Sequence, residues 1–204
     1  MDILAHGLWT AAGALTAKKK LKNKMRVGLA AFYGVFPDLF SFTVLTVWYA
    51  TQLLTGKVSA GHLPEPSEIE PSSPDTLWIF RLTNLLYGMS HSVFVFLAIA
   101  AIVFIFKRRV VWEMAGWLFH IGIDVFTHSY SFYPTPVLWP VSSWRFNGLS
   151  WETPWFMAVN YAALLLLYLF FIKKSLLSVS EEGRLRFLGK RLTLKPVSVS
   201  DKEE

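Results

Sequence analysis

The stretch VGLAAFYGVFPDLFSFTVLTVWYATQLL occupies residues 27–54 and carries one charged side chain, Asp38. About 20 apolar residues in a helix are enough to cross the hydrocarbon core of a bilayer, so this stretch predicts a membrane-spanning helix. Pro37 lies near its middle, where proline removes a backbone donor and kinks a helix. Asp38 follows the kink directly. Two roles fit its carboxylate: it is a metal ligand, or it is neutralised by a salt bridge or a proton.

Four further apolar runs follow the same pattern. They cover residues 3–17, 85–106, 110–126 and 155–172. The run 3–17 is short and rich in Gly and Ala, which let helix backbones approach closely in a membrane; we expect it to span the bilayer or to lie at its cytoplasmic face. The sequence therefore predicts an all-α, polytopic membrane bundle of four to five transmembrane helices.

Composition excludes several other classes of protein. Hydrophobic residues make up 53% of the 204 residues, charged residues only 17%, and there is no cysteine. A disordered chain would be polar and poor in aromatic residues. Without cysteine, the chain is not a disulfide scaffold, and any metal must be held by histidine and carboxylate.

The basic residues are distributed unevenly. All but three of the 20 Lys and Arg residues lie in segments 18–26, 107–109 and 173–204. Basic loops stay in the cytoplasm, so we expect these segments inside and the acidic segment 55–76 and the Trp-rich segment 127–154 outside. The net charge of +6 is then a topology signal that also contacts anionic membrane lipids, and we predict no nucleic-acid partner.

The chain is expected to have two regions. Residues 1–174 form the membrane-embedded domain, and residues 175–204 form a charged cytoplasmic tail. The stretch 185–192 mixes apolar and basic residues. It either lies on the inner membrane surface or belongs to a loosely ordered tail.

Ionisable residues inside the apolar runs are the strongest indication of function, because each costs at least about 2.5–3.5 kcal/mol at membrane depth. His120, Asp124 and His128 are spaced by four residues and therefore share one face of a helix. Imidazole nitrogen and carboxylate oxygen are ligands for zinc and similar divalent ions. The same pattern also fits a hydrogen-bonded pair without a metal.

Two other histidines lie at a similar depth. Counted at 1.5 Å per residue, His6 and His91 fall in the outer half of the membrane with His120 and Asp124, and Asp38 falls near the midplane. This convergence favours a metal site over a purely structural polar network. Glu113 lies four residues after Arg109 and is expected to form a surface ion pair with it.

Five segments carry a family resemblance. They are His6–Gly13, Gly34-Val35-Phe36-Pro37-Asp38, Gly88-Met89-Ser90-His91-Ser92, Gly116–Thr127 and Leu138-Trp139-Pro140-Val141-Ser142. In this order and spacing the chain resembles the YdjM-like family of membrane-bound, metal-dependent hydrolases of the bacterial inner membrane. The family is also distantly similar to the all-helical fold of zinc-dependent phospholipase C and single-strand nucleases, which cleave phosphoesters.

The resemblance implies a ligand set and a reaction. The presumed metal ligands are His6, Asp38, His91, His120 and Asp124, and the metal is expected to be zinc. The reaction is attack of a metal-activated water on an ester or phosphoester. Because the site is expected in the outer half of the bilayer, a lipid or lipid-linked ester is the expected substrate. The chain departs from the family at two places, where Phe40 replaces a second carboxylate and Leu86-Tyr87 replace His-Arg.

Further roles follow for residues near these ligands. Asp124 or His128 is the candidate general base, since histidine changes charge near neutral pH. Ser90 and Ser92 are expected to orient His91. Arg145 either binds an anionic substrate group or anchors its loop at the membrane interface.

Two other functions remain open on sequence alone. The polar residues could form a structural network in a membrane protein without catalysis. They could also relay protons in an ion-coupled transporter, although the chain has no visible inverted repeat.

Overall fold

The computed structural model describes residues 1–20, 25–57 and 77–192, with side chains described in 1–18, 25–57 and 77–177. These residues are helical apart from loops, with one isolated bridge between Ser129 and Phe132. The predicted all-α class is therefore confirmed for the described part of the chain. Most of the acidic segment 55–76, part of the basic segment 18–26 and the end of the tail lie outside the described residues. Two compact units are present, Met1–Leu164 and Leu165–Glu204.

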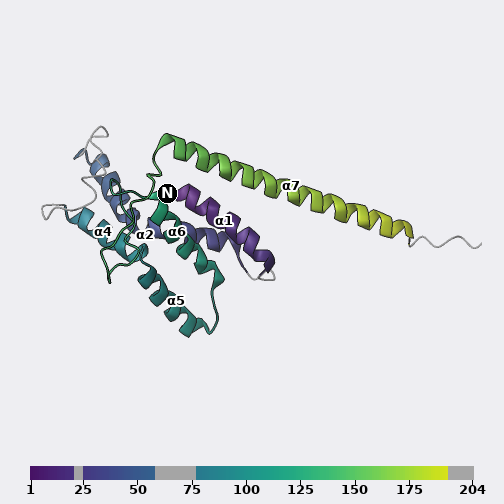
Figure 1. Ribbon diagram of the computed structural model, residues 1–204, viewed down its shortest axis with the longest axis horizontal. Coiled ribbons are helices and arrows are strands. Elements are labelled where there is room, and N and C mark those ends of the chain that lie inside the picture. The colour runs from purple at the N-terminus through teal and green to yellow at the C-terminus, as the bar shows by residue number, and fades with distance from the viewer. Residues whose placement is uncertain (21–24, 58–76, 193–204) are drawn as a thin grey trace, which may run out of the picture. The chain divides into compact units, whose positions relative to one another are not determined.

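The first unit is built around one long helix. Its elements are α1 (Ile3–Lys20), α2 (Val27–Leu54), α4 (Trp78–Ser90), α5 (Val93–Lys107), the short 3-10 helix η1 (Trp112–Met114) and α6 (Ala115–Thr127). The start of α7 (Pro154–Leu192) also belongs to it. Helix α2 packs against α1, α4 and α6 (Figure 1). Its buried positions include Gly34, Pro37, Asp38 and Ser41, three or four residues apart for the most part, as on one helix face.

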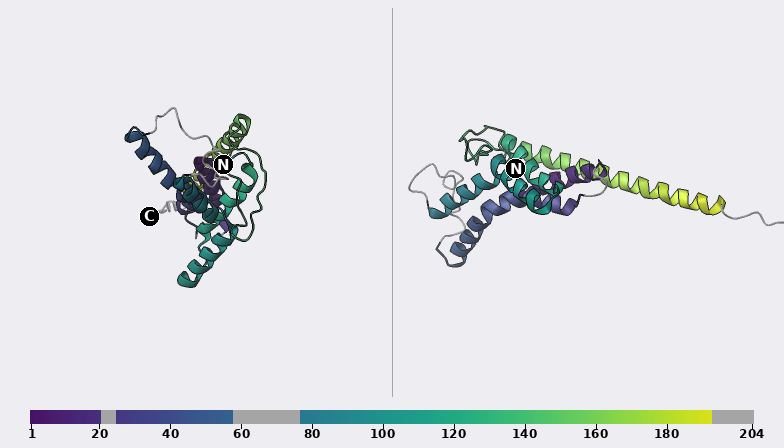
Figure 2. Two further views of the ribbon diagram at one scale, coloured as in Figure 1. Left: turned by 90° about the vertical axis from the view of Figure 1, so that its left-hand side faces the viewer. Right: turned by 90° about the horizontal axis from the view of Figure 1, so that it is seen from below.

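Residues 85–106 do not form the single helix that we predicted. Helices α4 and α5 are bent by 62° at a break after Ser90, and α5 diverges from the other helices of the unit (Figure 2). The cause is local, because the Ser92 hydroxyl accepts hydrogen bonds from the backbone N–H groups of Phe94 and Val95. Such a side-chain cap starts a new helix. His91 therefore lies at a helix break and not within a helix.

The apolar run 110–126 is also not the single helix that we predicted. It consists of η1 followed by α6, which has 13 residues. Helix α5 ends at Lys107, and Arg108 has a left-handed backbone with φ of 52°, so Arg109 and Glu113 do not share a helix. The predicted ion pair between them is wrong: Glu113 Oε1 instead accepts hydrogen bonds from Arg26 Nε at 3.0 Å and Arg26 N at 3.2 Å.

This contact between α2 and η1 changes the acidity of Glu113. Burial alone would raise its pKa, but hydrogen bonds from its own backbone and from Arg26 lower the pKa below the ordinary value. The charge of Arg26 acts in the same direction. The Glu113 carboxylate is thus held in its ionised form.

Small residues allow α1, α2 and α6 to approach closely. A Cβ atom added to Gly116 would lie 2.3 Å from the carbonyl oxygen of Ala30 and 2.8 Å from Thr10 Cγ2. A Cβ atom on Gly34 would lie 2.2 Å from Thr10 Oγ1. Neither glycine has room for a side chain, as expected where helix backbones nearly touch.

Two helices are long and apolar enough to cross a membrane, namely α2 and residues Pro154–Leu177 of α7. The bent pair α4 and α5 would make a third. Large apolar side chains face outward, including Leu54 at 88% and Phe106 at 82% exposure, and such faces indicate membrane association. Neither α1 nor α6 meets the same criterion, so the predicted four to five spans are not confirmed. The predicted domain boundary after residue 174 falls inside α7 and stays a prediction.

Candidate metal centre

Four buried side chains from three parts of the chain meet in the first unit. Asp38 comes from α2, His91 from the break between α4 and α5, and His120 and Asp124 from α6. One ligand atom from each residue lies within 4.8 Å of the others. Three of the four residues are fully enclosed, and Asp38 is 7% exposed. Together they could hold a metal ion.

Each element brings its ligand in for a local reason. His120 and Asp124 are four residues apart on α6 and so point the same way. His91 is fully buried at the break between α4 and α5. Asp38 follows Pro37 on the buried face of α2.

The spacing of the ligand atoms suits a tetrahedral ion. His91 Nε2 and His120 Nε2 are 3.0 Å apart. Their distances to Asp124 Oδ2 are 3.4 Å and 3.1 Å, and those to Asp38 Oδ1 are 3.6 Å and 3.7 Å. Ligand atoms about 2.0–2.1 Å from a tetrahedral zinc ion lie about 3.3 Å from one another, which is within this range.

The protonation of His120 follows from its other nitrogen. Nδ1 of His120 lies 2.7 Å from the carbonyl oxygen of Gly34, which can only accept a hydrogen bond. Nδ1 must therefore carry the proton, and in a neutral imidazole the lone pair is then on Nε2. This is the usual arrangement of a histidine that binds metal through Nε2.

A chain of hydroxyl groups orients His91 in the same way. Ser41 Oγ donates to the carbonyl oxygen of Pro37 at 2.7 Å, so it can only accept from Ser90 Oγ, also at 2.7 Å. Ser90 has then used its proton and accepts from His91 Nδ1 at 2.9 Å. The carbonyl oxygen of Tyr87, 3.2 Å from the same nitrogen, is a second acceptor.

Two imidazole lone pairs and two carboxylates thus face one another in a buried space. Asp124 Oδ2 has no hydrogen-bond partner there. A buried carboxylate needs a compensating positive charge, and lone pairs that converge need a cation or an additional proton between them. Two nitrogen and two oxygen donors fit zinc or another first-row divalent ion.

The second oxygen of Asp124 faces a different set of groups. His6 Nε2 is 2.8 Å, His128 Nε2 is 3.4 Å and the amino group of Met1 is 2.5 Å from Oδ1. The His6 ring also packs on His120, with 3.7 Å between ring centroids. His6 is therefore next to the group of four but contacts its carboxylate from the opposite side.

The other predicted site residues have separate positions. Ser90 contacts His91 as described, whereas Ser92 caps α5 and donates to the carbonyl oxygen of Trp139. Arg145 is exposed in the loop before α7, and its carbonyl oxygen accepts a hydrogen bond from the Tyr130 hydroxyl at 3.1 Å. The structure does not bring Arg145 into the group of four.

Several supporting residues were not identified from sequence. Ser41 and the Gly34 carbonyl set the two tautomers, the Tyr87 ring stacks on His91 with centroids 3.8 Å apart, and Trp117 Nε1 donates to the carbonyl oxygen of Ser90. For Ser41 a signal was available, since it lies one helical turn after Pro37 and serine commonly bonds a carbonyl four residues earlier. Contacts made by a backbone carbonyl or by ring stacking have no comparable pattern in the sequence from which they could be predicted.

No family model, no curated protein and no solved structure matches the chain.

Proposed function

We propose that this protein is a membrane-embedded, metal-dependent hydrolase that cleaves an ester or phosphoester bond of a lipid or lipid-linked substrate. One observation carries the proposal: the Nε2 atoms of His91 and His120 converge on two buried carboxylates, while hydrogen bonds at Nδ1 keep both lone pairs free. Many large apolar side chains of the first unit face outward, so a substrate dissolved in the membrane would meet this unit most directly.

The metal would be held by Asp38, His91, His120 and Asp124, and zinc fits this donor set. Because these four ligands already fill a tetrahedral shell, a water would have to bind at a fifth position, where zinc would lower its pKa to about 7 and would polarise a substrate oxygen. The resemblance to YdjM-like hydrolases supports the same assignment.

Residues on the far side of Asp124 would manage the proton. His128 is 6% exposed, its Nδ1 has no hydrogen-bond partner, and its Nε2 lies 2.9 Å from the Met1 amino group and 3.4 Å from Asp124 Oδ1. A neutral imidazole in this position can accept a proton from water and deliver it to a leaving group. Thr127, the neighbouring hydroxyl, lies 3.5 Å from the same carboxylate oxygen. Arg145, in the exposed loop, would attract an anionic head group.

The proposed location is the bacterial inner membrane, with four to five spans. Basic segments 18–26, 107–109 and the tail would be cytoplasmic, and the centre would lie toward the outer side. Membrane lipids are the proposed partners, and no nucleic acid is involved.

Metal analysis tests the proposal. Protein purified in mild detergent without chelator should retain about one zinc ion per chain, measured by inductively coupled plasma mass spectrometry. The double variant His120→Ala, Asp124→Ala should lose it. His62→Ala, which changes the histidine of the acidic segment 55–76, is the control and should retain the metal.

The outcomes separate the competing functions. Wild-type protein that is free of metal would overturn the hydrolase. If the double variant lowers stability and no preparation holds metal, the cluster is a structural polar network. Proton or ion flux into liposomes that is abolished by the same double variant would indicate transport.

A further inference from the structure

Large apolar and aromatic side chains are exposed where α6 ends and the following loop folds back on it. They are Phe126, Tyr130, Trp144, Phe146 and Leu149, and each is between 40% and 63% exposed. We call this group the aromatic surface. None of the four residues of the metal centre belongs to it, so it is a separate feature of the first unit.

Hydrogen bonds and a ring contact hold the aromatic surface together. The backbone N–H of Leu149 donates to the carbonyl oxygen of Phe126 at 2.9 Å. The Tyr130 hydroxyl donates to the carbonyl oxygen of Arg145 at 3.1 Å. The rings of Phe126 and Phe146 are in edge contact, with 5.6 Å between their centroids. The exposed group is therefore a defined surface of the fold and not a set of unrelated side chains.

The composition of this surface fits the interface between lipid and water. Trp and Tyr rings settle at the level of the lipid headgroups, because each combines an apolar ring with a polar tip. Residues 129–153 contain one basic and one acidic side chain, Arg145 and Glu152, so the aromatic side chains and not a net charge would determine the contact. Exposed apolar groups of this kind mark a contact with a membrane or with another protein.

The position of the surface relative to α7 favours the membrane. The candidate span of α7 begins at Pro154 and has 24 residues. A helix of this length rises about 36 Å, more than the roughly 30 Å of the hydrocarbon core, so its first residues lie at the interface. Trp151, three residues earlier, donates from its backbone N–H to the carbonyl oxygen of Thr127 at 3.0 Å. The end of α6 and the aromatic surface beside it are therefore at the level of the interface.

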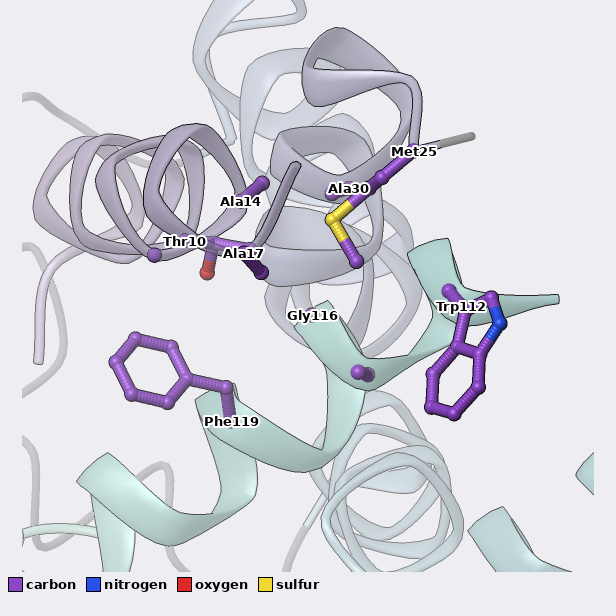
Figure 3. Close-up of a pocket in the computed structure, with 10 residues that line it drawn as sticks. Thr10, Ala14, Ala17, Met25, Ala30, Trp112, Gly116 and Phe119 are labelled. Atoms are coloured by element: carbon purple, nitrogen blue, oxygen red, sulfur yellow. The ribbon is translucent and has the colours of Figure 1, made fainter. Parts of the chain in front are cut away.

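The opposite end of α6 agrees with this depth. Helix α6 and the preceding η1 together are about 25 Å long, so the ion pair of Glu113 and Arg26 would come near the other interface, where charges are tolerated. Between the two levels, a pocket that is lined largely by apolar side chains, including Phe119, lies between α1, α2 and α6 (Figure 3). Such a lining suits the hydrocarbon core, in which polar groups without partners are costly.

We propose that the aromatic surface lies in the interfacial layer of a lipid bilayer and holds the metal centre at that level. Asp124 precedes Phe126 by two residues, which is about 3 Å along α6. The centre would then be level with the ester and phosphate groups of the membrane lipids. The inference rests on the proposed hydrolase for the use of this depth, because a lipid ester and water meet there. The position of the surface in the bilayer is a separate property that can be measured without any reaction.

A spin label measures this depth. Full-length protein with Leu149→Cys is labelled with a nitroxide and reconstituted into vesicles of phosphatidylcholine and phosphatidylglycerol. The chain has no cysteine of its own, so only this position carries the label. Its accessibility to oxygen, which is concentrated in hydrocarbon, is divided by its accessibility to a water-soluble nickel chelate. Zinc content is measured on the same samples.

Two reference positions calibrate this ratio. Lys57→Cys lies three residues beyond the end of α2, whose 28 residues rise about 42 Å, so its label is in water. Leu166→Cys lies near the middle of the α7 span and is 67% exposed, so its label is in hydrocarbon. The ratio at Leu149 should be several times higher than at Lys57 and several times lower than at Leu166. Phe146→Cys should agree with Leu149→Cys.

A pair of variants tests whether the aromatic side chains are responsible. Trp144→Ser combined with Phe146→Ser should shift the label at Leu149 toward the value for water. Phe94→Ser is the control, since Phe94 is an aromatic residue of similar exposure on α5, and it should leave the label unchanged. An equal effect of the double variant and the control would contradict the inference.

The remaining outcomes are distinct from those of the hydrolase. A ratio at Leu149 equal to that at Lys57 would place the surface in water and overturn the inference even if zinc is bound, leaving another protein as its partner. A ratio equal to that at Leu166 would overturn it as well, and spin–spin broadening between labels at Leu149 would indicate a contact between two copies instead. Interfacial depth in metal-free protein would support the position of the surface and contradict the hydrolase.

Discussion

The hydroxyl of Ser41 contacts neither histidine of the metal centre, yet together with the Tyr87 carbonyl oxygen it favours a proton on Nδ1 of His91. Its own proton goes to the Pro37 carbonyl, so Ser90 can donate to Ser41 at 2.7 Å, or to the Tyr87 carbonyl oxygen at 3.4 Å, and accept from His91. The lone pair on His91 Nε2 is therefore held in place by a residue on another helix. Groups that orient a metal ligand in this way commonly affect affinity 10–100-fold.

Ser41→Ala should weaken zinc binding by roughly 10–100-fold while the protein stays folded. Without Ser41, the Ser90 proton retains only the more distant Tyr87 carbonyl oxygen as an acceptor. It can then point at His91 Nδ1 more often, which favours the tautomer whose Nε2 is protonated. Competition with a chromogenic chelator measures the affinity. Thr43→Ala is the matched control, since Thr43 makes the same type of bond to Leu39 on an exposed face of α2; a similar loss of affinity in both variants would contradict the relay.

Much of this centre could be predicted because polar residues are conspicuous in apolar runs. Asp38, His91, His120 and Asp124 were all candidates on that ground, and the structure brings them together. His6 was a candidate on the same ground, but depth alone cannot tell which oxygen of Asp124 a histidine will face. The Gly34 carbonyl could not have been predicted, since every residue has one and only the crossing of α2 and α6 selects it.

The contact between α2 and α6 depends on the absence of a side chain at Gly116. Because a Cβ atom there would lie 2.3 Å from the Ala30 carbonyl oxygen, the two backbones would have to separate. Backbone atoms yield less than the end of a side chain, so the strain would spread to His120, one turn further along α6.

Gly116→Ala should destabilise the protein by about 1–3 kcal/mol, the usual cost of overpacking. Gly122→Ala, on the same helix but with no atom within 4 Å of the added Cβ, should be neutral or up to about 1 kcal/mol stabilising through helix propensity. Unfolding in detergent, followed by circular dichroism, compares the two. Equal stability of both variants would mean that α2 and α6 are not in close contact.

The ion pair of Glu113 and Arg26 should make the contact between α2 and η1 dependent on pH. The pKa of Glu113 is lowered in the folded protein, so its stabilising effect is present above its unfolded pKa of about 4.3 and is lost as the pH falls through the lower folded value. Arg26 is largely exposed, and the contribution should be less than about 1 kcal/mol. Wild type and Glu113→Gln should therefore differ in unfolding midpoint at neutral pH and converge only when the pH falls below the lowered folded pKa of Glu113. A difference that persists in acid would contradict this assignment.

The helix break at His91 is a feature that average hydropathy does not detect. Residues 85–106 are apolar enough for one span, and a running average is insensitive to three small or polar residues. The break arises because the Ser92 hydroxyl accepts hydrogen bonds from the backbone N–H groups of Phe94 and Val95. Such a cap depends on the local backbone geometry and not on the amino-acid composition of the run. The same segment, Ser90-His91-Ser92, had been singled out for its chemistry, although its effect on the backbone was not predicted.

The arrangement of the whole protein in the membrane depends on whether α4 and α5 cross it. Together they pass the length and hydropathy test, but a 62° bend is also compatible with a loop that enters and leaves on one side. The basic segment 107–109 after α5 favours a cytoplasmic end. A crossing would then place the start of α4 on the outer side.

Single introduced cysteines can decide between these arrangements. The chain has no cysteine of its own, so no other residue would react with a thiol-specific label. Leu77 and Val110 flank the bent pair, and their side chains are 51% and 53% exposed. If the pair crosses, a membrane-impermeant maleimide applied to spheroplasts should label Leu77→Cys at once and Val110→Cys only after the membrane is permeabilised. Ser143→Cys, in the Trp-rich loop expected outside, is the positive control. Labelling of both flanking positions from outside would indicate a re-entrant loop and would place segment 107–109 on the outer side, against the charge rule.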